Sequence, residues 1–366
     1  MKISINRETL LKPLQQVAGV VERRQTLPVL SNVLMRAEGT QLSMTGTDLE
    51  VEMQGHMDAN VEDSGEVTVP ARKLMDIVRQ LPDESEVSFA LNEQRLQIVS
   101  GRFKSNLSTL PASDFPTVDT SEVEATVKVS AAAFKQLLDR TAFAMAQQDV
   151  RYFLNGMLIE ISGDGVRVVA TDGHRLATSV LSMDHGVSEV KQVIIPRKGI
   201  LELQRMLSDE EGDVDITLGS NHLRARASQM TLTTKLVDGK FPDYNRVIPK
   251  DGNKVISAER EVLRQALSRT AILSNEKFRG IRLNISDQQI QLSANNPEQE
   301  EAEELVSVDY GGVELEIGFN VGYLLDALGV AEGKEVRVTL NDANSPALIE
   351  SPDNEQSVYV VMPMKL

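Results

Sequence analysis

The chain has 366 residues, no cysteine and a formal net charge of −16. This length predicts two or three domains, and the lack of cysteine excludes disulfides, a thiolate nucleophile and cysteine-bound zinc. No apolar run approaches the ~18 residues of a membrane helix, and the first residues turn polar too early for a signal peptide, so we expect a cytoplasmic protein without a membrane partner. The net charge alone argues against a nucleic-acid partner, because such binding usually needs a basic surface.

Helical and strand patterns alternate from the N-terminus onward. Apolar residues recur at helical spacing from Leu10 to Val21, although Pro13 lies inside that stretch. A second stripe from Leu74 to Leu81 predicts another helix. Short alternating segments, typical of strands, follow each helical stretch.

The same order of elements then occurs twice more. Helical stripes run from Phe134 to Met145 and from Ile200 to Leu207, and again from Val262 to Thr270 and from Leu324 to Leu328. Gly163-Asp164-Gly165 separates two alternating segments, which indicates a hairpin. Two helices and several antiparallel strands in each unit predict an α+β fold.

Short motifs recur at nearly constant spacing, which predicts three tandem copies of one unit. Thr45-Gly46-Thr47-Asp48 is repeated as Val169-Ala170-Thr171-Asp172 and as Ser293-Ala294-Asn295-Asn296, at steps of 124 residues. Val69-Pro70-Ala71-Arg72-Lys73 is repeated as Ile195-Pro196-Arg197-Lys198-Gly199 and more loosely as Phe319-Asn320-Val321-Gly322-Tyr323. We therefore expect domains at residues 1–120, 121–250 and 251–366.

Positive charge is concentrated in the predicted helices. The six helical segments carry a net charge of +10, so the rest of the chain carries −26. If the helices all face one way, one surface attracts phosphate and the opposite surface repels it. Alternatively, amphipathic helices simply carry solvated basic faces. The helix from Asn320 to Gly329 breaks the pattern, because its only charged residue is Asp326.

Sequence motifs for catalysis are missing. No phosphate-binding loop, HExxH or GxSxG pattern occurs. Asp172-Gly173-His174 could orient an imidazole, but a turn after a strand explains the same residues. The acidic run from Glu298 to Glu304 lacks the glycine pattern of a calcium loop. It could be a solvated face, or a docking edge for basic residues of the first unit in a head-to-tail contact between subunits.

Long and unusual runs of this sequence resemble the beta subunit of bacterial DNA polymerase III, the sliding clamp family, of the gammaproteobacterial kind. They include Gln148-Asp149-Val150-Arg151-Tyr152, Leu154-Asn155-Gly156-Met157-Leu158, and the C-terminal residues 359–366. The resemblance covers essentially the whole chain. It implies a head-to-tail homodimer ring of six similar domains, with helices lining the hole and strands outside. It also implies a processivity factor without catalytic site, cofactor or metal, which encircles duplex DNA and tethers the DNA polymerase III catalytic subunit.

The resemblance also implies three groups of site residues. Sequence-independent contacts with double-stranded DNA are expected at Arg24, Arg72, Gln148, Tyr152, Phe153, Arg197 and Lys198. A hydrophobic pocket for a short peptide of polymerases, the clamp loader and repair proteins is expected at Leu154, Thr171, Gly173, His174, Arg175, Leu176, Pro242, Arg246, Val247, Asn320, Tyr323, Val360, Met362, Pro363 and Met364. The dimer interface is expected at Lys73, Arg95, Arg102, Lys104, Leu107, Ile272, Leu273, Glu298, Glu300, Glu301, Glu303 and Glu304. Relatives often carry Tyr at the position of Phe153, so DNA contacts there are expected to differ.

Two other interpretations stay open at this point. The chain could be an enzyme, such as a hydrolase, that uses the turn at Asp172 and His174. It could also be a repeat scaffold that binds acidic or peptide partners without DNA. A clamp should stay on closed circular DNA and leave it once the circle is cut, whereas a scaffold would show no such dependence.

Overall fold

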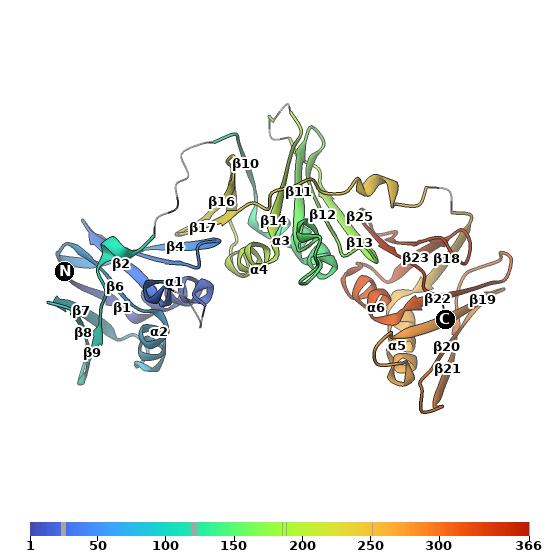
Figure 1. Ribbon diagram of the computed structural model, residues 1–366, viewed down its shortest axis with the longest axis horizontal. Helices are drawn as coiled ribbons and strands as arrows, with labels where there is room; N and C mark the ends of the chain where they lie inside the picture. The colour runs from blue at the N-terminus through green and yellow to red at the C-terminus, as the bar shows by residue number, and fades with distance from the viewer. Residues whose placement is uncertain are drawn as a thin grey trace. The chain divides into compact units, whose positions relative to one another are not determined.

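The chain folds into two compact units of strands and helices (Figure 1). The computed structural model describes residues 1–22, 27–116, 118, 123–184, 186–187, 189–250 and 252–365. Unit 1 comprises Met1–Lys135 and Ile195–Leu236, and unit 2 comprises Gln136–Ile194 and Val237–Leu366. Both units combine antiparallel sheets with α-helices, as the α+β prediction requires. None of the helices in the described ranges is long and apolar enough to cross a membrane.

One order of elements recurs three times along the chain. The first copy contains β1 (Lys2–Asn6), α1 (Arg7–Val20), η1 (Pro28–Ser31), β2 (Asn32–Glu38), β3 (Gln41–Thr47), β4 (Val51–Asp58), β5 (Asn60–Asp63), β6 (Gly65–Pro70), α2 (Ala71–Gln80), β7 (Glu86–Asn92), β8 (Arg95–Ser100), β9 (Phe103–Ser108) and η2 (Ala112–Asp114). The second contains β10 (Ala125–Ser130), α3 (Ala131–Thr141), η3 (Ala142–Ala144), η4 (Tyr152–Leu154), β11 (Gly156–Ser162), β12 (Gly165–Thr171), β13 (Arg175–Leu181), β14 (Lys191–Pro196), α4 (Arg197–Met206), β15 (Asp213–Leu218), β16 (His222–Ala227), β17 (Met230–Lys235) and η5 (Tyr244–Arg246). The third contains β18 (Lys254–Glu259), α5 (Arg260–Thr270), η6 (Ala271–Leu273), β19 (Gly280–Ser286), β20 (Gln289–Asn295), β21 (Glu301–Ser307), β22 (Leu315–Asn320), α6 (Val321–Val330), β23 (Glu335–Leu340), β24 (Ala347–Ser351) and β25 (Asn354–Val361).

Strand pairing joins each copy to the next. In unit 1 the strand orders are β5-β1-β7-β8-β9 and β10-β15-β16-β17-β4-β3-β2-β6, and in unit 2 they are β14-β11-β12-β13-β25-β24-β23-β18 and β21-β20-β19-β22. The last strand of the second copy, β17, pairs with β4 of the first copy. The last strand of the third copy, β25, pairs in the same way with β13 of the second. Each unit therefore contains elements of more than one copy.

The first helix of the chain is continuous through Pro13. It begins after Asn6, whose side chain accepts a hydrogen bond from the N–H of Glu8 (2.9 Å), an N-cap that satisfies one free backbone donor. Its buried face contains Leu10 and Leu14, as the helical spacing predicts. The prediction of a helix from Phe134 to Met145 is wrong at its C-terminal end. There the chain tightens after Thr141 into the 3₁₀ turn η3, so Met145 lies beyond the helix.

An arginine at the start of the first helix locks the helix pair in two copies. In the first copy, Arg7 donates from Nε to the carbonyl of Val78 in α2 (3.1 Å). In the third, Arg260 donates from Nη1 to the carbonyl of Leu328 in α6 (2.9 Å). Both carbonyls lie in the last turn of the second helix, where four such groups lack helical partners. The two helices of each of these copies therefore pack at the same relative position.

Candidate functional site

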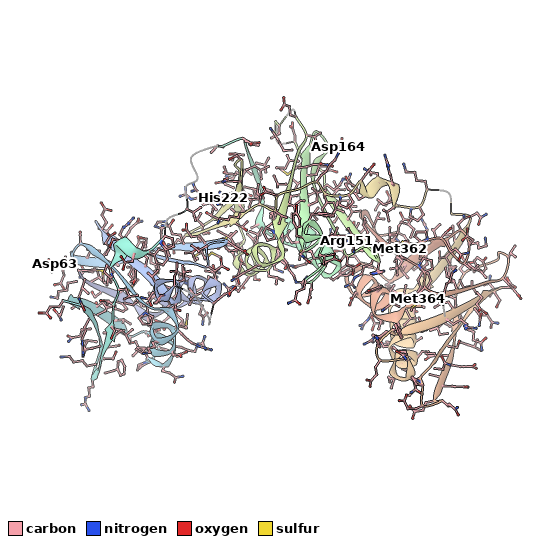
Figure 2. All side chains as sticks on the ribbon, viewed as in Figure 1. Asp63, Arg151, Asp164, His222, Met362 and Met364 are labelled. Atoms are coloured by element: carbon pink, nitrogen blue, oxygen red, sulfur yellow. The ribbon has the colours of Figure 1, made fainter. Side chains whose placement is uncertain are left out.

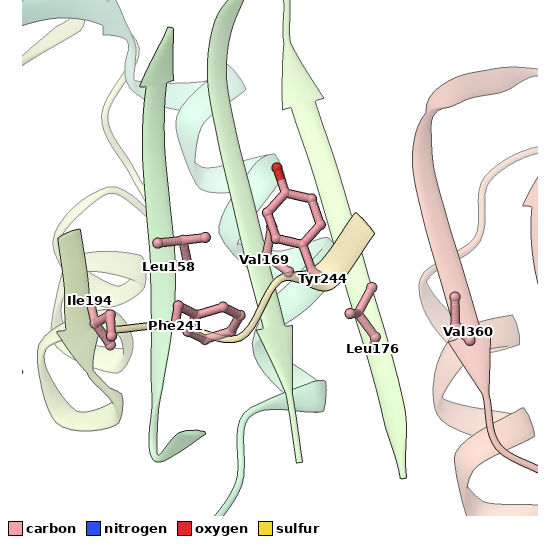
Figure 3. Close-up of a cluster of buried hydrophobic side chains, with 7 residues drawn as sticks. All are labelled: Leu158, Val169, Leu176, Ile194, Phe241, Tyr244 and Val360. Carbon is pink, nitrogen blue, oxygen red and sulfur yellow. The ribbon is translucent and has the colours of Figure 1, made fainter. Parts of the chain in front are cut away.

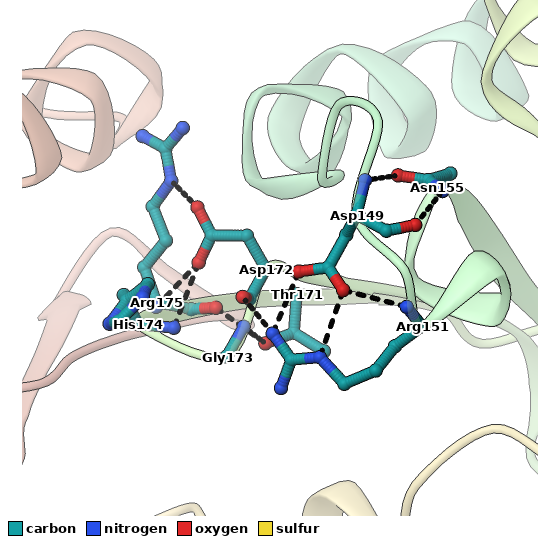
Figure 4. A network of polar contacts seen from close by, with 8 residues as sticks. All are labelled: Asp149, Arg151, Asn155, Thr171, Asp172, Gly173, His174 and Arg175. Carbon is teal, nitrogen blue, oxygen red and sulfur yellow. Dashed lines mark hydrogen bonds and ion pairs between the residues drawn. The ribbon is translucent and has the colours of Figure 1, made fainter.

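The repeated Thr-Asp motif forms the same turn in the first two copies. After β12, Thr171 Oγ1 donates to the carbonyl of Arg175 (2.6 Å), and Asp172 Oδ1 accepts from the N–H groups of His174 (2.9 Å) and Arg175 (3.0 Å) (Figure 4). We call this the Thr171-Asp172 turn. These bonds hold the turn closed, as expected for Asp in such positions.

The Thr47-Asp48 turn, after β3, repeats these bonds. Thr47 Oγ1 donates to the carbonyl of Val51 (3.0 Å), and Asp48 Oδ1 accepts from the N–H groups of Glu50 (2.9 Å) and Val51 (2.7 Å). Because the first turn has no histidine, the shared geometry is structural. In the second turn Asp172 bonds the backbone of His174, and the His174 ring stacks on Tyr323 with centroids 6.3 Å apart. This favours the turn interpretation over a catalytic pair.

Arg175 connects the Thr171-Asp172 turn to its surroundings in unit 2. Its Nε donates to Asp172 Oδ2 (3.1 Å), and its Nη2 donates to the carbonyl of Phe143 in η3 (2.8 Å). The guanidinium also forms an ion pair with Asp326 of α6 and lies over the Tyr323 ring, 4.6 Å from its centroid. Asp326, the charge that breaks the basic pattern of the helices, therefore has a structural partner.

A short loop before β11 is held against this turn. Asp149 accepts from the backbone N–H of Arg151 (2.8 Å) and from its guanidinium, and Arg151 Nη2 also donates to the carbonyl of Asp172 (3.2 Å). The side-chain hydrogen bond from Arg151 lowers the pKa of Asp149 to about 2. Asn155 donates to the carbonyl of Asp149 and accepts from its N–H. The loop is thus fixed by its own polar side chains.

A pocket of about 300 Å³ opens beside these two loops in unit 2. Its wall is mainly apolar and consists of Arg151, Phe153, Leu154, Thr171, Gly173, Arg175, Leu176, Phe241, Pro242, Tyr244, Val247, Val360 and Met362. Leu176 on β13 lies opposite Val360 on β25, so the pairing of two copies builds part of the wall. Arg151 and Met362, both labelled in Figure 2, line the same pocket.

The pocket has a packed apolar base. Leu158, Val169, Leu176, Ile194, Phe241, Tyr244 and Val360 form one buried cluster (Figure 3). Phe241 and Tyr244 come from the segment after β17, which crosses the strands that carry Leu158 and Val169. Tyr244 also donates from its hydroxyl to Glu160 (3.3 Å). A rigid apolar floor with a few polar groups at the edge is typical of sites that bind a small apolar segment.

The wall contains most but not all of the residues expected at the peptide pocket. It includes Leu154, Thr171, Gly173, Arg175, Leu176, Pro242, Val247, Val360 and Met362. His174, Arg246, Asn320, Tyr323, Pro363 and Met364 are not part of this wall. Conversely, Arg151, Phe241 and Tyr244 line the pocket without having been expected there, and Phe153 lines it although we expected a DNA contact. The aromatic pair Phe241 and Tyr244, beside Pro242, was the available sequence signal.

The residues expected to contact DNA have varied environments. Arg24 lies outside the described residues. Arg72 is exposed on α2, and Gln148 adopts a left-handed backbone conformation (φ 57°) in the loop before β11. Tyr152 in the same loop is 57% exposed. A side chain as open as Tyr152 is free to meet a ligand.

Lys198 is engaged by carboxylates within unit 1. It forms ion pairs with Asp48 and with Glu22 (2.7 Å to Oε1), beside Arg197 at the start of α4. Burial lowers the pKa of Lys198, but the hydrogen bonds to Asp48 and Glu22 outweigh it and the net shift is upward. The side chain therefore stays charged, with much of that charge already neutralised by its partners.

The residues expected at the dimer interface lie at the ends of two sheets. In unit 1, Lys104 and Leu107 are on the edge strand β9, with Arg95 and Arg102 on the same hairpin and Lys73 on α2. In unit 2, Glu301, Glu303 and Glu304 are on the edge strand β21, with Glu298 and Glu300 in the preceding loop. Ile272 and Leu273 belong to η6, and the Ile272 side chain is 76% exposed. No cluster among the described acidic and histidine residues could hold a metal ion.

The chain is similar to known proteins over nearly its whole length. Three family models match in tandem: the DNA polymerase III beta subunit N-terminal domain at residues 1–119, its central domain at residues 128–243 and its C-terminal domain at residues 245–365. The chain belongs to the beta sliding clamp family. A beta sliding clamp of Pseudomonas putida is 57% identical over 367 residues, and that of Escherichia coli K12 is 50% identical over 368 residues, with full coverage of both chains in each case.

Solved structures of sliding clamps have the same fold. The crystal structure of the DNA polymerase III subunit beta from Pseudomonas aeruginosa superposes with a TM-score of 0.98 at 57% identity, with full coverage of both chains. The Caulobacter crescentus pol III beta structure gives 0.96 at 39% identity, again with full coverage. One similar structure is a Pseudomonas aeruginosa sliding clamp bound to griselimycin, with a TM-score of 0.97 at 57% identity and full coverage. The three copies expected from sequence agree with the three clamp domains that these family models describe.

Proposed function

We propose that two copies of this chain close head to tail into a ring of six repeats, which encircles duplex DNA and tethers DNA polymerase III and other replication and repair proteins. The ring has no active site of its own in this proposal. One observation carries it: the last strand of each later copy pairs with the same strand of the copy before it, β17 with β4 and β25 with β13. The first copy also ends in such a last strand, β9, and the third copy has the counterpart of β4 and β13, which is β21. Both β9 and β21 are edge strands of their sheets.

The internal pairing rule also predicts how β9 and β21 would meet. Thr231 of β17 lies opposite Gln54 of β4. The closing turns of the β16–β17 and β8–β9 hairpins both have two residues, which makes Lys104 the counterpart of Thr231. Gln54 lies opposite Thr45, and Glu303 lies opposite Ser293, the residue equivalent to Thr45 in the third copy. Glu303 is therefore the counterpart of Gln54. The same register between two chains would therefore set Lys104 opposite Glu303, an attractive cross-strand pair.

The acidic and basic ends of the chain favour this direction of assembly. Basic residues surround β9, and a run of glutamates surrounds β21. Exposed ion pairs contribute only ~0–1 kcal/mol each, so they would orient the contact. Backbone pairing of two free edges and apolar contact at the exposed Ile272 would supply most of the affinity. A head-to-tail contact of this kind closes into a ring when the rotation allows.

The pocket of unit 2 is the proposed peptide site. Its volume of about 300 Å³ suits a few apolar side chains, and its wall combines leucine, valine and methionine, which adapt to several partners. Arg151 and Arg175 at the wall are already paired with Asp149 and Asp172, and their remaining N–H capacity would serve backbone carbonyls of the bound segment. Polymerases, the clamp loader and repair proteins would then compete for one site.

The proposed DNA contact is weak and independent of sequence. Arg72, Gln148, Tyr152 and Arg197, together with Arg24, would meet phosphates without reading bases. Phe153 and Lys198 are weaker candidates, because Phe153 lines the pocket and Lys198 is bound by Asp48 and Glu22. A ring that holds DNA by topology does not need tight phosphate contacts, and tight contacts would slow sliding.

Topological retention on DNA tests the proposal. The labelled chain is loaded by the clamp loader onto nicked circular DNA and separated by gel filtration, and the circle is then cut once with a restriction enzyme. We expect retention on the circle and release of most of the protein after the cut. Equal retention on circular and linear DNA, or no retention on either, would overturn the ring. Adding DNA-end blocks to the cut DNA should restore retention.

A further inference from the structure

Two cations hold equivalent positions where one copy of the repeat meets the next. Lys198 donates from Nζ to the carbonyl of Val20 at the end of α1 (3.2 Å) and to the carboxylate of Asp48 in the Thr47-Asp48 turn. Arg175 donates to the carbonyl of Phe143 in η3, the 3₁₀ turn that follows α3 (2.8 Å), and to Asp172 in the Thr171-Asp172 turn (3.1 Å). In both places one cation joins the C-terminal end of the first helix to the acid of the turn.

Electrostatics explains why a cation is placed there twice. The last carbonyls of a helix lack helical partners and carry partial negative charge. Helix α1 has no basic residue in its last turn, and the cation at its end comes from α4. The Asp48 side chain is 5% exposed, and a nearly buried carboxylate requires a partner.

The third copy has the same parts but no cation among the described residues. Its first helix ends in η6, and Asn296 occupies the position of Asp48 and Asp172 in what we call the Asn295-Asn296 turn. The N–H of Asn296 donates to the carbonyl of Glu300 (3.2 Å), as the N–H of Asp48 donates to that of Val51 (3.2 Å). Glu300 therefore stands near the position that Arg175 holds in the second copy. Within the described ranges, no cationic side chain bonds Asn296 or a carbonyl of η6.

The second helix of each copy shows where the missing cation can come from. Lys198 follows Pro196 in the repeated Pro motif, and the corresponding residue after Pro70 in the first copy is Arg72. We call the contact between one copy and the next a junction. In the third copy this position is Gly322, which has no side chain, and at the second junction the cation is Arg175. Arg72 is exposed on α2 and forms no hydrogen bond or ion pair with any residue in the described ranges. Among the described residues, no carbonyl at the end of a helix accepts a hydrogen bond from Arg72.

We infer that Arg72 of one copy donates to the carbonyl end of η6 and to Asn296 Oδ1 of a second copy, as Lys198 binds Val20 and Asp48 within one chain. Asn296 Oδ1 also accepts from the N–H of Glu300 (2.9 Å), so Arg72 would use its second lone pair. This inference rests on the proposed ring, and it moves Arg72 from the DNA contacts proposed above to the subunit interface. A guanidinium suits the task, because its planar fork can donate to two neutral oxygens at once.

The chemistry makes this junction the weakest of the three. Lys198 is held by two carboxylates, of Asp48 and Glu22, whereas Arg72 would meet an amide at Asn296. Asn275, which occupies the region of Glu22 after the helix end, is also an amide, and its Oδ1 already accepts from the N–H groups of Lys277 and Phe278 (3.0 Å each). Hydrogen bonds to neutral acceptors are weaker than those to charged ones. At the turn position itself, the interface between two chains thus has an amide where the first two turns have an acid.

Restoring that acid gives a gain-of-function test. Asn296→Asp copies the first two turns, and we expect the dimer dissociation constant of the full-length chain to fall about fivefold to tenfold. Arg72→Gln should raise it by a similar factor. In the double variant the gain from Asn296→Asp should vanish, because the carboxylate has lost its cation. Dissociation is measured by dilution with mass photometry or sedimentation, at low and at high salt.

A matched control separates this contact from general charge effects. Lys12→Gln removes one exposed positive charge from α1, which is not part of the proposed contact, and should leave dimerisation unchanged. Asn296→Asp places a carboxylate beside Glu300, which accepts from the Asn296 side chain (2.6 Å) in the unmodified chain, so this variant also disturbs the hairpin. Arg72→Gln tests the same contact without changing the hairpin. Unchanged dimer affinity in Arg72→Gln, or a gain from Asn296→Asp that persists without Arg72, overturns the assignment while the ring stands. A chain that remains monomeric at every concentration overturns the ring and this inference together.

Discussion

The Thr47-Asp48 turn and the Thr171-Asp172 turn have the same backbone bonds but different surroundings. In the first, Glu52 of β4 lies opposite Thr233 of β17. In the second, Leu176 of β13 holds the position of Glu52 and lies opposite Val360 of β25. The register confirms that these positions correspond, because Glu52 pairs with Thr47 and Leu176 pairs with Thr171. The turn is therefore common to both copies, whereas the cross-strand pair beside it is polar in the first copy and apolar in the second.

The two turns also differ in the origin of the cation that binds their aspartate. At the first turn Lys198 reaches in from α4 and fills the space beside Asp48. At the second, the corresponding helix position is Gly322, and Arg175 from the turn itself bonds Asp172. The pocket wall of unit 2 includes Arg175 and Gly173. In the second copy the cation thus comes from the turn instead of the helix, and an apolar pocket lies beside it.

The largest expected effect comes from placing a glutamate at Leu176, because Glu52 holds the corresponding position beside the first turn. Leu176→Glu places a carboxylate on the apolar wall, where the nearby arginines already have partners in Asp149 and Asp172. We expect binding of a labelled peptide from the DNA polymerase III catalytic subunit to weaken more than 100-fold, or about 3 kcal/mol. Fluorescence anisotropy measures the affinity, and circular dichroism checks the fold.

The control for this prediction keeps the apolar wall. Leu176→Met preserves volume and hydrophobicity and should change the peptide affinity by less than about threefold. If the acidic variant binds the peptide as tightly as the unmodified chain while remaining folded, the pocket is not the peptide site. The difference between the two turns would then affect only the packing of the strands.

A medium effect is expected from removing the carboxylate of Glu52 on β4, beside the first turn. Burial raises the pKa of Glu52 to about 7, against the opposing effect of Arg224. The folded state therefore binds the proton more tightly than the unfolded chain. The contribution of this group to stability is fully present below pH 4.5 and is lost as pH rises towards 7. Glu52→Gln should remove this loss and stabilise the protein at pH 8 by about 2 kcal/mol.

Denaturant unfolding at several pH values measures this difference. The stability gained by Glu52→Gln should be near zero at pH 4, increase between pH 4.5 and 7, and stay constant above that range. A variant that is less stable than the unmodified chain at pH 8 would show that Arg224 holds Glu52 charged. Peptide binding in unit 2 should be the same in both proteins at every pH.

The local parts of this structure could be predicted from sequence. The helical stripes identify α1, α2 and α4 to α6, because each buries an apolar face whose spacing is visible in a few turns. The motif at Thr171 and Asp172 predicts a turn for a similar reason, since its hydrogen bonds join residues at most four apart. The resemblance to the clamp family then indicated most of the pocket wall.

The remaining features depend on contacts between distant residues. Arg151, Phe241 and Tyr244 meet at the pocket only after β13 and β25 have paired and the segment after β17 has crossed the sheet. The charge count of the helices is also incomplete as a guide to DNA contacts. It includes Lys198, which Asp48 and Glu22 bind from 150 and 176 residues away. A formal charge predicts a surface potential only where the side chain lacks such partners.

The smallest expected effect comes from the acid of α6, and it tests whether Arg175 needs a partner outside its own turn. The Asp326 side chain is 49% exposed, so water already solvates much of its charge. Asp326→Asn leaves Arg175 bonded to Asp172 and to the carbonyl of Phe143. We expect a loss of less than about 1 kcal/mol of unfolding free energy, and the loss should shrink at high salt.

Denaturant unfolding at two salt concentrations checks this small change, with Arg167→Gln as the control. Arg167 forms an ion pair with Glu160 at 3.7 Å on the strands next to the pocket, and its loss should be of similar size. A loss above about 2 kcal/mol in Asp326→Asn would exceed what an exposed pair supplies. The bond from α6 would then be as important to the second turn as Lys198 is to the first. In that case an ion pair with the second helix of the next copy would stabilise both turns. In the first turn the helix would supply the cation, Lys198, and in the second it would supply the anion, Asp326.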